Sequence, residues 1–274
     1  MDKELMFESP SFIKRIKGML SVDFYRLFHT PLFYIFIAIS AIIPAMILAM
    51  TGMENPTTGE IVKLYDNTWQ VIAASEPLYV VRDIAEYTNM NMVYIFGGIM
   101  ISIFIGHDYK SGYVKQLFTT HAKKQDYMIS KSAIGAFSMA CMCVSYLFGT
   151  IIAGAIVQYS FSVNVGSLLI AILSKIIMSI GWASLYTMLN VVFRRYFGIS
   201  IASCFFLGTG ILIIGAAAIV GNSSILNIFL YGSSVYACLT SNILTLIVCL
   251  GVSCLWAFIY NLVGTYILSK SDVY

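Results

Sequence analysis

The chain has 274 residues, of which 59% are hydrophobic and only 11% charged, and its formal net charge is +3. Together with a mean hydropathy of +0.85, this excludes a soluble domain, whose surface needs charges of both signs, and indicates a protein that crosses a membrane several times. A spanning helix takes about 20 apolar residues, so a chain of this length has room for roughly six spans.

The first predicted element is an amphipathic helix within residues 1–30. Phe12, Ile16 and Leu20 recur at helical spacing on one side, and the basic residues, Arg26 among them, lie largely on the others. Such a helix lies along a membrane surface with its basic residues near anionic headgroups. The segment is therefore predicted to be a cytoplasmic interface helix. The sequence leaves open whether it only anchors the chain or also contacts a cytoplasmic partner.

Six apolar segments follow, each long enough to cross a bilayer as a helix. They comprise residues 31–52, 89–106, 132–158, 167–193, 197–220 and 241–268. Residues 221–240 are too apolar for an ordinary loop and too interrupted for another span, so a short re-entrant or interfacial helix is expected there on the outer side. The predicted fold is an all-α integral membrane protein, with six transmembrane helices in a single permease domain of residues 1–274.

Charge sets the predicted orientation of these spans. Thirteen of the 16 Lys and Arg residues fall in segments 1–30 and 107–131, at Arg194 and Arg195, and at Lys270. With six spans, all of these lie on one side of the membrane, and the acidic loop 53–88 lies on the other. Because short cytoplasmic loops carry an excess of Lys and Arg, both termini are predicted to be cytoplasmic and loop 53–88 to face outward.

The cytoplasmic loop 107–131 mixes lysines with apolar side chains, which include Tyr109, Tyr113 and Leu117. A topology signal needs the lysines but not the aromatic residues. An apolar patch rimmed by charge favours docking of another protein, and the alternative is a solvated loop that only sets orientation.

The same loop resembles a known family. The run Asp108-Tyr109-Lys110-Ser111-Gly112-Tyr113-Val114-Lys115, followed by Lys123-Lys124 and Ser130-Lys131, is similar to the loop between the second and third spans of ABC type-2 exporter permeases. The chain matches that family at the acidic residue, the glycine, the basic-apolar run and the closing lysine. It departs at Tyr113, where Thr is usual, and at Lys124, where Arg is common. The six spans, the amphipathic N-terminal helix and the large first outer loop extend the resemblance.

This resemblance implies a membrane subunit of a bacterial ATP-driven exporter in the plasma membrane. Two such permease subunits, as a homodimer or a heterodimer, pair with two cytoplasmic ABC ATPase subunits that hold ATP and Mg. The loop then forms a short coupling helix, and its implied contacts with the ATPase are Asp108, Tyr109, Lys110, Gly112, Tyr113, Lys115 and Leu117. By analogy with small exporters, the substrate is amphipathic: an antimicrobial peptide, a drug or a lipid-like molecule.

The chain itself is not expected to be an enzyme or to hold a cofactor or metal. It contains no G-x-x-x-x-G-K-[ST] phosphate-binding loop, so ATPase activity is expected on the partner subunit. Its three histidines are scattered, and no nucleophile, base and acid come together in the sequence. The expected partners are the ATPase, a second permease and membrane lipid, with no nucleic acid.

Two features lie inside the spans. Small and polar residues follow each other at i+4 spacing in the last span: Ser241, Thr245, Cys249, Ser253, Ala257 and Asn261. Such a row favours close helix packing with hydrogen bonds across the interface, and a substrate-lining face is the alternative. Lys175 is the one charge well inside an apolar segment. It is expected to snorkel toward the outer interface, or else to contact an anionic group on a lipid or peptide.

Three other functions remain open. An ATP-independent channel or secondary transporter needs an intramembrane ionisable network, yet no Asp or Glu occurs from Tyr127 to Ser271. A membrane-embedded enzyme needs clustered His, Asp or Glu near the end of a span. A non-transporting immunity subunit of the same permease family would share every feature of the sequence. The missing carboxylates favour an energy source on another polypeptide.

Overall fold

The computed structural model describes residues 11–50, 53–54, 61–62, 68, 80–119, 122–158, 165–194, 196–208, 228–239 and 242–270. The helices are α1 (Phe12–Phe28), α2 (Pro31–Met50), α4 (Val80–Lys110), α5 (Tyr113–Thr119), α6 (Lys124–Ile156), α7 (Val165–Val192), α8 (Phe197–Gly208), α11 (Leu230–Leu239) and α12 (Ile243–Lys270). The two-residue strands β1 (Met53–Glu54) and β2 (Ile61–Val62) pair antiparallel, with Met53 opposite Val62. Apart from this pair, the secondary structure of the described residues is helical.

Three helical segments are long and apolar enough to cross a membrane: α6, residues Leu168–Val192 of α7, and α12. The helices Phe12–Phe28 and Pro31–Met46, bent by 67° at the break between them, would make a fourth span if the pair counts as one. The described part of the chain therefore has the composition of a membrane protein with three to four candidate spans.

The remaining expected segments are represented as follows. Helix α4 contains the whole of segment 89–106 and begins well before it. The fifth segment is described only as the short apolar helix α8, which ends at Gly208. Residues 209–220, most of loop 53–88 and the first part of segment 221–240 lie outside the described residues. In the second part of segment 221–240, α11 is a helix of 10 residues.

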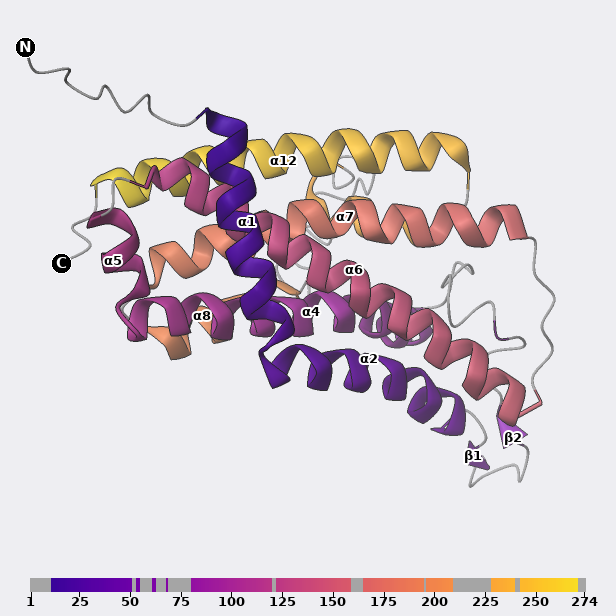
Figure 1. Ribbon diagram of the computed structural model, residues 1–274. Coiled ribbons are helices and arrows are strands. Elements are labelled where there is room, and N and C mark those ends of the chain that lie inside the picture. Colours follow the sequence, from indigo (N-terminus) through magenta and orange to yellow (C-terminus); the bar gives the residue numbers. More distant parts are fainter. Residues whose placement is uncertain are drawn as a thin grey trace, which may run out of the picture.

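The long helices lie side by side, and α1 crosses them (Figure 1). Helix α7 packs against α12 and α6, α6 packs against α2, and α1 lies across α6. The helices α2, α4, α6 and α7 alternate in direction along the chain, and α12 runs in the same direction as α7. As a result, α5, the start of α6 and the C-terminal ends of α4, α7 and α12 gather at one end of the bundle, and β1 and β2 lie at the other. We call the first of these the basic end.

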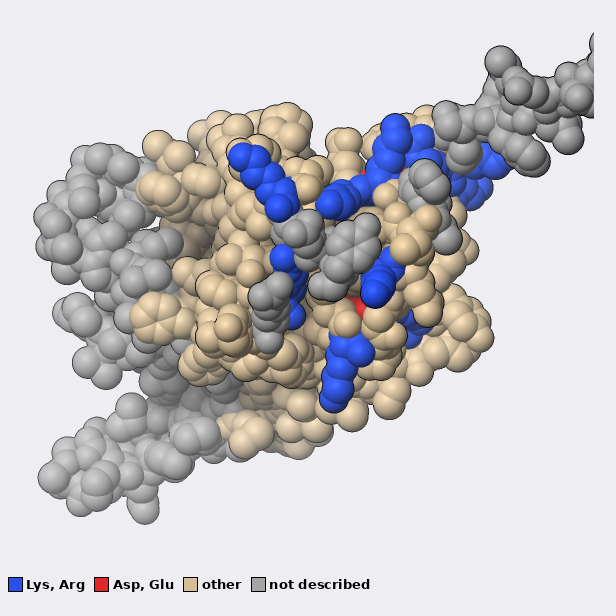
Figure 2. Space-filling view, turned by 90° about the vertical axis from the view of Figure 1, so that its left-hand side faces the viewer, with Lys and Arg blue, Asp and Glu red and all other residues tan. Residues whose placement is uncertain are grey.

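Lysine and arginine side chains dominate the surface of the basic end, where little acidic surface is visible (Figure 2). Its exposed lysines include Lys110, Lys115, Lys123 and Lys270. The bundle therefore brings together basic residues from separate parts of the sequence.

The sharp bend between α1 and α2 has a local cause. Thr30 Oγ1 donates to the carbonyl oxygen of Arg26 at 2.7 Å, and the Thr30 amide donates to Leu27 O at 3.1 Å. These bonds cap the last turn of α1. Pro31 then opens α2, a position that proline favours because it lacks the amide that a first turn leaves unpaired.

Small residues let α6 approach α2 closely. Ser145 Oγ donates to the carbonyl oxygen of Ile37 at 2.8 Å. One turn further along α6, a Cβ atom added to Gly149 would lie 2.1 Å from the carbonyl oxygen of Ala41. Only glycine permits this contact, because the group that it meets is backbone and cannot move aside.

Candidate functional site: a buried charge network at the basic end

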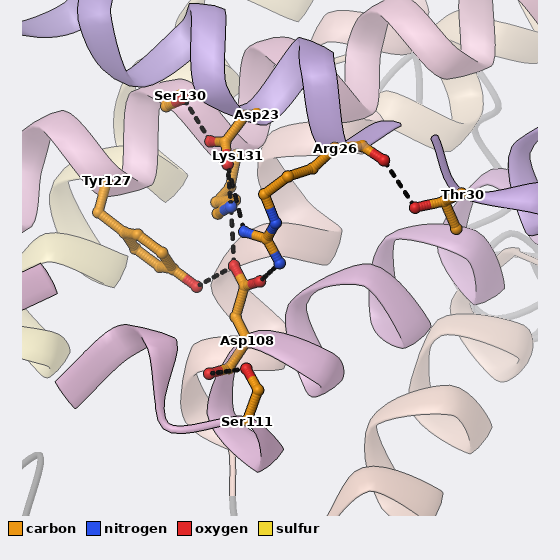
Figure 3. A network of polar contacts seen from close by, with 8 residues as sticks. All are labelled: Asp23, Arg26, Thr30, Asp108, Ser111, Tyr127, Ser130 and Lys131. Carbon is orange, nitrogen blue, oxygen red and sulfur yellow. Dashed lines mark hydrogen bonds and ion pairs between the residues drawn. The ribbon is translucent and has the colours of Figure 1, made fainter. Parts of the chain in front are cut away.

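Four charged side chains from three helices meet at the basic end (Figure 3). Asp23 and Arg26 come from α1, Asp108 from α4 and Lys131 from α6. The Nζ atom of Lys131 lies 2.6 Å from Asp23 Oδ1 and 2.7 Å from Asp108 Oδ2. Arg26 donates through Nη2 to the other oxygen of Asp108, and its Nη1 lies 3.6 Å from Asp23 Oδ1. With two charges of each sign, the network is formally neutral.

Three of the four members of the network are shielded from solvent, and the Arg26 side chain is 24% exposed. Asp23 and Asp108 are 0% exposed and Lys131 is 2% exposed. Hydroxyl groups supply further bonds: Ser130 Oγ donates to Asp23 Oδ2 at 2.6 Å, and Tyr127 OH lies 3.4 Å from Asp108 Oδ2. Buried charges persist only when they are paired and hydrogen-bonded. Each buried charge of the network therefore depends on its oppositely charged partners to remain stable in the folded protein.

The sequence places these groups by simple helical geometry. Asp23, Arg26 and Leu27 share one face of α1 because residues three and four apart are neighbours on a helix, and Leu27 is completely buried beside them. Asp108 lies in the last turn of α4, where the negative end of the helix dipole disfavours a carboxylate. Arg26 and Lys131 offset that unfavourable position.

Aromatic rings extend the network to α5. The guanidinium carbon of Arg26 lies 4.4 Å from the ring centre of Tyr113, the first residue of α5, and 5.2 Å from that of Phe104. Lys131 Nζ lies 4.8 Å from the Phe104 ring centre and 5.6 Å from that of Tyr113. These distances allow cation–π attraction. Burial is the largest cause that raises the pKa of the Tyr113 phenol.

The turn between α4 and α5 depends on Gly112, whose φ of +73° lies in the left-handed region. Glycine adopts this conformation without the Cβ clash that other residues meet. The turn reverses the chain directly after Asp108, so Tyr113 returns to the same network.

One side of α5 packs onto the ends of three long helices. Val114 is 1% exposed and belongs to a cluster with residues of α6, α7 and α12: Tyr127, Met128, Val191 and Leu268. Leu117 and Phe118 pack against the same cluster. Lys115 and Gln116 are exposed. Helix α5 thus has an apolar side on the bundle and a polar side directed outward.

A second ion pair ties the beginning of α1 to the beginning of α6. Arg15 Nε donates to Asp126 Oδ2 at 2.7 Å, and Asp126 is 1% exposed. Helix α1 is therefore held against α6 at two points, one near each of its ends.

The seven residues predicted to contact an ATPase divide by exposure. Lys110 and Lys115 are exposed, whereas Tyr109, Gly112, Tyr113 and Leu117 are half-buried. Asp108 is fully buried, so its carboxylate contacts α1 and α6 and offers no surface to a partner. Contact between the other six residues and an ATPase stays a prediction.

The residues predicted for the interface helix lie along α1. Phe12 is 45% exposed, Ile16 and Leu20 are half-buried, and Arg26 belongs to the network. Asp23 was not predicted. The available signal was a lone carboxylate in the basic segment 11–30, placed among apolar residues three positions after Leu20 and four before Leu27. A carboxylate on the apolar side of such a helix needs a buried cation.

The polar row of α12 faces neighbouring helices. Thr245, Cys249, Ser253 and Ala257 are buried. Ser253 Oγ donates to Ile177 O at 2.7 Å and accepts from the Gly181 amide at 2.9 Å. Asn261 Nδ2 donates to Ser184 Oγ at 3.2 Å, and Asn261 Oδ1 accepts from Ser132 Oγ at 3.0 Å. Ser241 lies outside the described residues.

Lys175 lies in the first half of α7, where its carbonyl oxygen accepts a hydrogen bond from Tyr94 OH at 3.0 Å. Its side chain is half-buried, and a functional contact for it stays a prediction.

In the part of the chain that the structure describes, no group of three or more His, Cys, Asp or Glu residues is arranged to hold a metal ion. Comparisons of the chain with protein-family models, curated proteins and solved structures find no match.

Proposed function

We propose that this protein is the membrane-spanning permease subunit of an ATP-driven exporter in the plasma membrane of a bacterial cell. It moves an amphipathic substrate outward, such as an antimicrobial peptide, a drug or a lipid-like molecule. A second permease subunit completes the pathway, and a separate cytoplasmic ABC ATPase binds ATP and Mg. The six-span count and the cytoplasmic position of both termini are part of this proposal.

The observation that carries the proposal is the position of α5. Its apolar side, centred on Val114, touches α6, α7 and α12, and Tyr113 at its start contacts Arg26 of α1. A force on the exposed side of α5 therefore reaches the ends of four other helices at once. Packed interfaces of this kind shift between discrete arrangements and do not deform gradually, as a coupling helix requires.

The charge network connects the end of α4 to α1 and α6. Asp108, at the end of α4, is held by Lys131 of α6 and Arg26 of α1. Because Asp108 and Lys131 are shielded from water, their attraction is stronger than that of a surface ion pair. Displacement of α5 would therefore move the ends of α1, α4 and α6 together.

Charge supports a cytoplasmic location for α5. It lies at the basic end (Figure 1), whose surface is rich in lysine and arginine (Figure 2), and the positive-inside rule assigns such a surface to the cytoplasm. ATP is available on that side of the membrane, so an ATPase could reach the exposed Lys115 and Gln116.

The test begins with co-expression of the chain and the ATPases encoded by neighbouring genes, followed by co-purification and reconstitution in liposomes. Lys115→Glu, on the exposed side of α5, is expected to weaken association and to lower substrate-stimulated ATP hydrolysis. Lys270→Glu makes the same charge change at the same end but on α12, so it serves as the matched control and is expected to retain both.

Two results would contradict the proposal. One is unchanged association and turnover in Lys115→Glu. The other is sustained transport of a substrate against its gradient by the purified chain alone, which would indicate a secondary transporter.

A further inference from the structure

A second site lies beside the C-terminal part of α4. A cavity of about 520 Å³ opens between the C-terminal parts of α4 and α7 and the start of α8. Its polar lining includes His107, Tyr109, Lys110 and Arg194. Asp108, which lies between two of these residues in the sequence, joins the network instead. Near the end of α4, Asp108 thus contacts the charge network, whereas His107 and Lys110 line the cavity.

Two donors in this cavity are left unsatisfied. The Nη1 atom of Arg194 and the hydroxyl of Tyr109 are buried and have no hydrogen-bond partner among the described residues. Leaving a buried donor unbonded costs about 1–3 kcal/mol, and more for a charged group. A ligand with acceptor oxygens would satisfy both. Asn190 and Ser200, which also line the cavity, bond to each other.

Among the described residues, no carboxylate lines the cavity. None occurs in the sequence from Tyr127 to Ser271 either. The buried acids at the basic end are engaged elsewhere: Asp23 and Asp108 with Lys131 and Arg26, and Asp126 with Arg15. Within the described residues, no ion pair involves Lys110 or Arg194. The cavity therefore favours an anion from outside the chain.

Part of the cavity lining is apolar. Ile103, Phe193 and Phe197 form this part, and α4 touches α8 closely here, because a Cβ atom added to Gly106 would lie 2.4 Å from the Phe197 ring. Next to this lining, Tyr196, which directly precedes α8, is 63% exposed and Ile199 of α8 is 49% exposed. A free phosphate ion would leave this apolar part uncovered. A molecule with an anionic head and an apolar tail would cover it.

We propose that this cavity binds the phosphate headgroup of an anionic phospholipid. Arg194, Tyr109 and Lys110 donate to the phosphate oxygens, and the apolar part of the lipid lies along Phe197 and the outer face of α8. Basic pockets between transmembrane helices at a cytoplasmic surface are suited to such headgroups. This assignment does not depend on the proposed transport function, because it needs only the membrane and the cavity.

The experiment uses the purified full-length chain in mixed micelles that contain equal amounts of phosphatidylglycerol and phosphatidylcholine. Native mass spectrometry counts the lipids that remain bound. The wild-type chain is expected to retain phosphatidylglycerol selectively. Arg194→Gln and Lys110→Gln are each expected to lower its retention about fivefold, the effect of one basic group near an anionic lipid surface. Arg194→Lys keeps the charge and should restore part of the binding. Lys123→Gln removes an exposed charge at the same end but outside the cavity and should retain the lipid.

Inorganic phosphate is added in a separate arm to distinguish the source of the anion. If it displaces phosphatidylglycerol completely at millimolar concentration, the ligand is a soluble anion and the lipid assignment is overturned. Equal lipid retention in wild type, Arg194→Gln and Lys110→Gln also overturns it. Thermal unfolding without lipid checks that each variant is folded, and Lys110, which is exposed, provides the test if Arg194→Gln does not fold.

Discussion

Asp23 and Lys131 lie 108 positions apart in the sequence, yet Lys131 Nζ lies 2.6 Å from Asp23 Oδ1 and both side chains are buried. The contact fixes α1 to α6 beside the end of α4. Helix α1 therefore does more than lie along a surface, because a buried ion pair ties it to the helices that carry the loop around α5. Anything that moves α5 acts on α1 as well.

Replacing Lys131 by Met should strongly destabilise the protein, because two buried carboxylates would then face Arg26 alone. Breaking a buried pair in this way costs about 3–5 kcal/mol. The expected result is a lower midpoint of thermal unfolding in detergent, together with faster amide hydrogen exchange in α1.

The double variant Asp23→Asn with Lys131→Met supplies the control, because it removes one charge of each sign and keeps the site neutral. It should recover a large part of the lost stability, since groups in direct contact are not additive. Strictly additive effects of the two substitutions would show that the pair is not coupled as the structure indicates.

Gly112→Ala should also destabilise the chain, because a φ of +73° is unfavourable for alanine by about 1–2 kcal/mol. Helix α5 would then be held less firmly beside Asp108. Thermal unfolding measures the loss, and exchange of the amides of α5 locates it.

Gly18→Ala is the matched control for this change. Gly18 lies inside α1, and a Cβ atom added there would meet no atom of another described element within 4 Å. Alanine is preferred to glycine in a helix interior, so this variant should be as stable as the wild type or more stable. A loss of stability equal to that of Gly112→Ala would remove the argument from the turn.

Gly149→Ala tests the contact between α6 and α2. The added methyl group would lie 2.1 Å from the backbone oxygen of Ala41, so the two helices must separate. Overpacking of this kind costs about 1–3 kcal/mol, and a lower unfolding midpoint is expected. Gly251→Ala in α12, where a Cβ atom has open space among the described residues, should be tolerated. Equal stability of the two variants would contradict the close approach.

The apolar segments themselves could be predicted from sequence, because hydrocarbon excludes unpaired backbone groups and charges. Long apolar runs in such a chain can only be helices, and the structure is helical with three to four candidate spans. The mixture of lysines and aromatic residues in 107–131 also marked the loop in which α5 forms. The sequence of this loop did not show that Asp108 is buried, because its burial depends on contacts with Arg26 of α1 and Lys131 of α6.

The sequence by itself determined that the chain is helical and apolar enough for a membrane, and that its basic residues are concentrated in a few segments. Both follow from hydropathy and charge along short stretches of sequence. Only the tertiary structure decided which charges meet. Asp23, Asp108 and Lys131 come from three helices, and Arg194 reaches the cavity beside Tyr109 through the packing of α7 and α8 on α4. These pairings depend on helix crossings between residues far apart in sequence, which local periodicity does not specify.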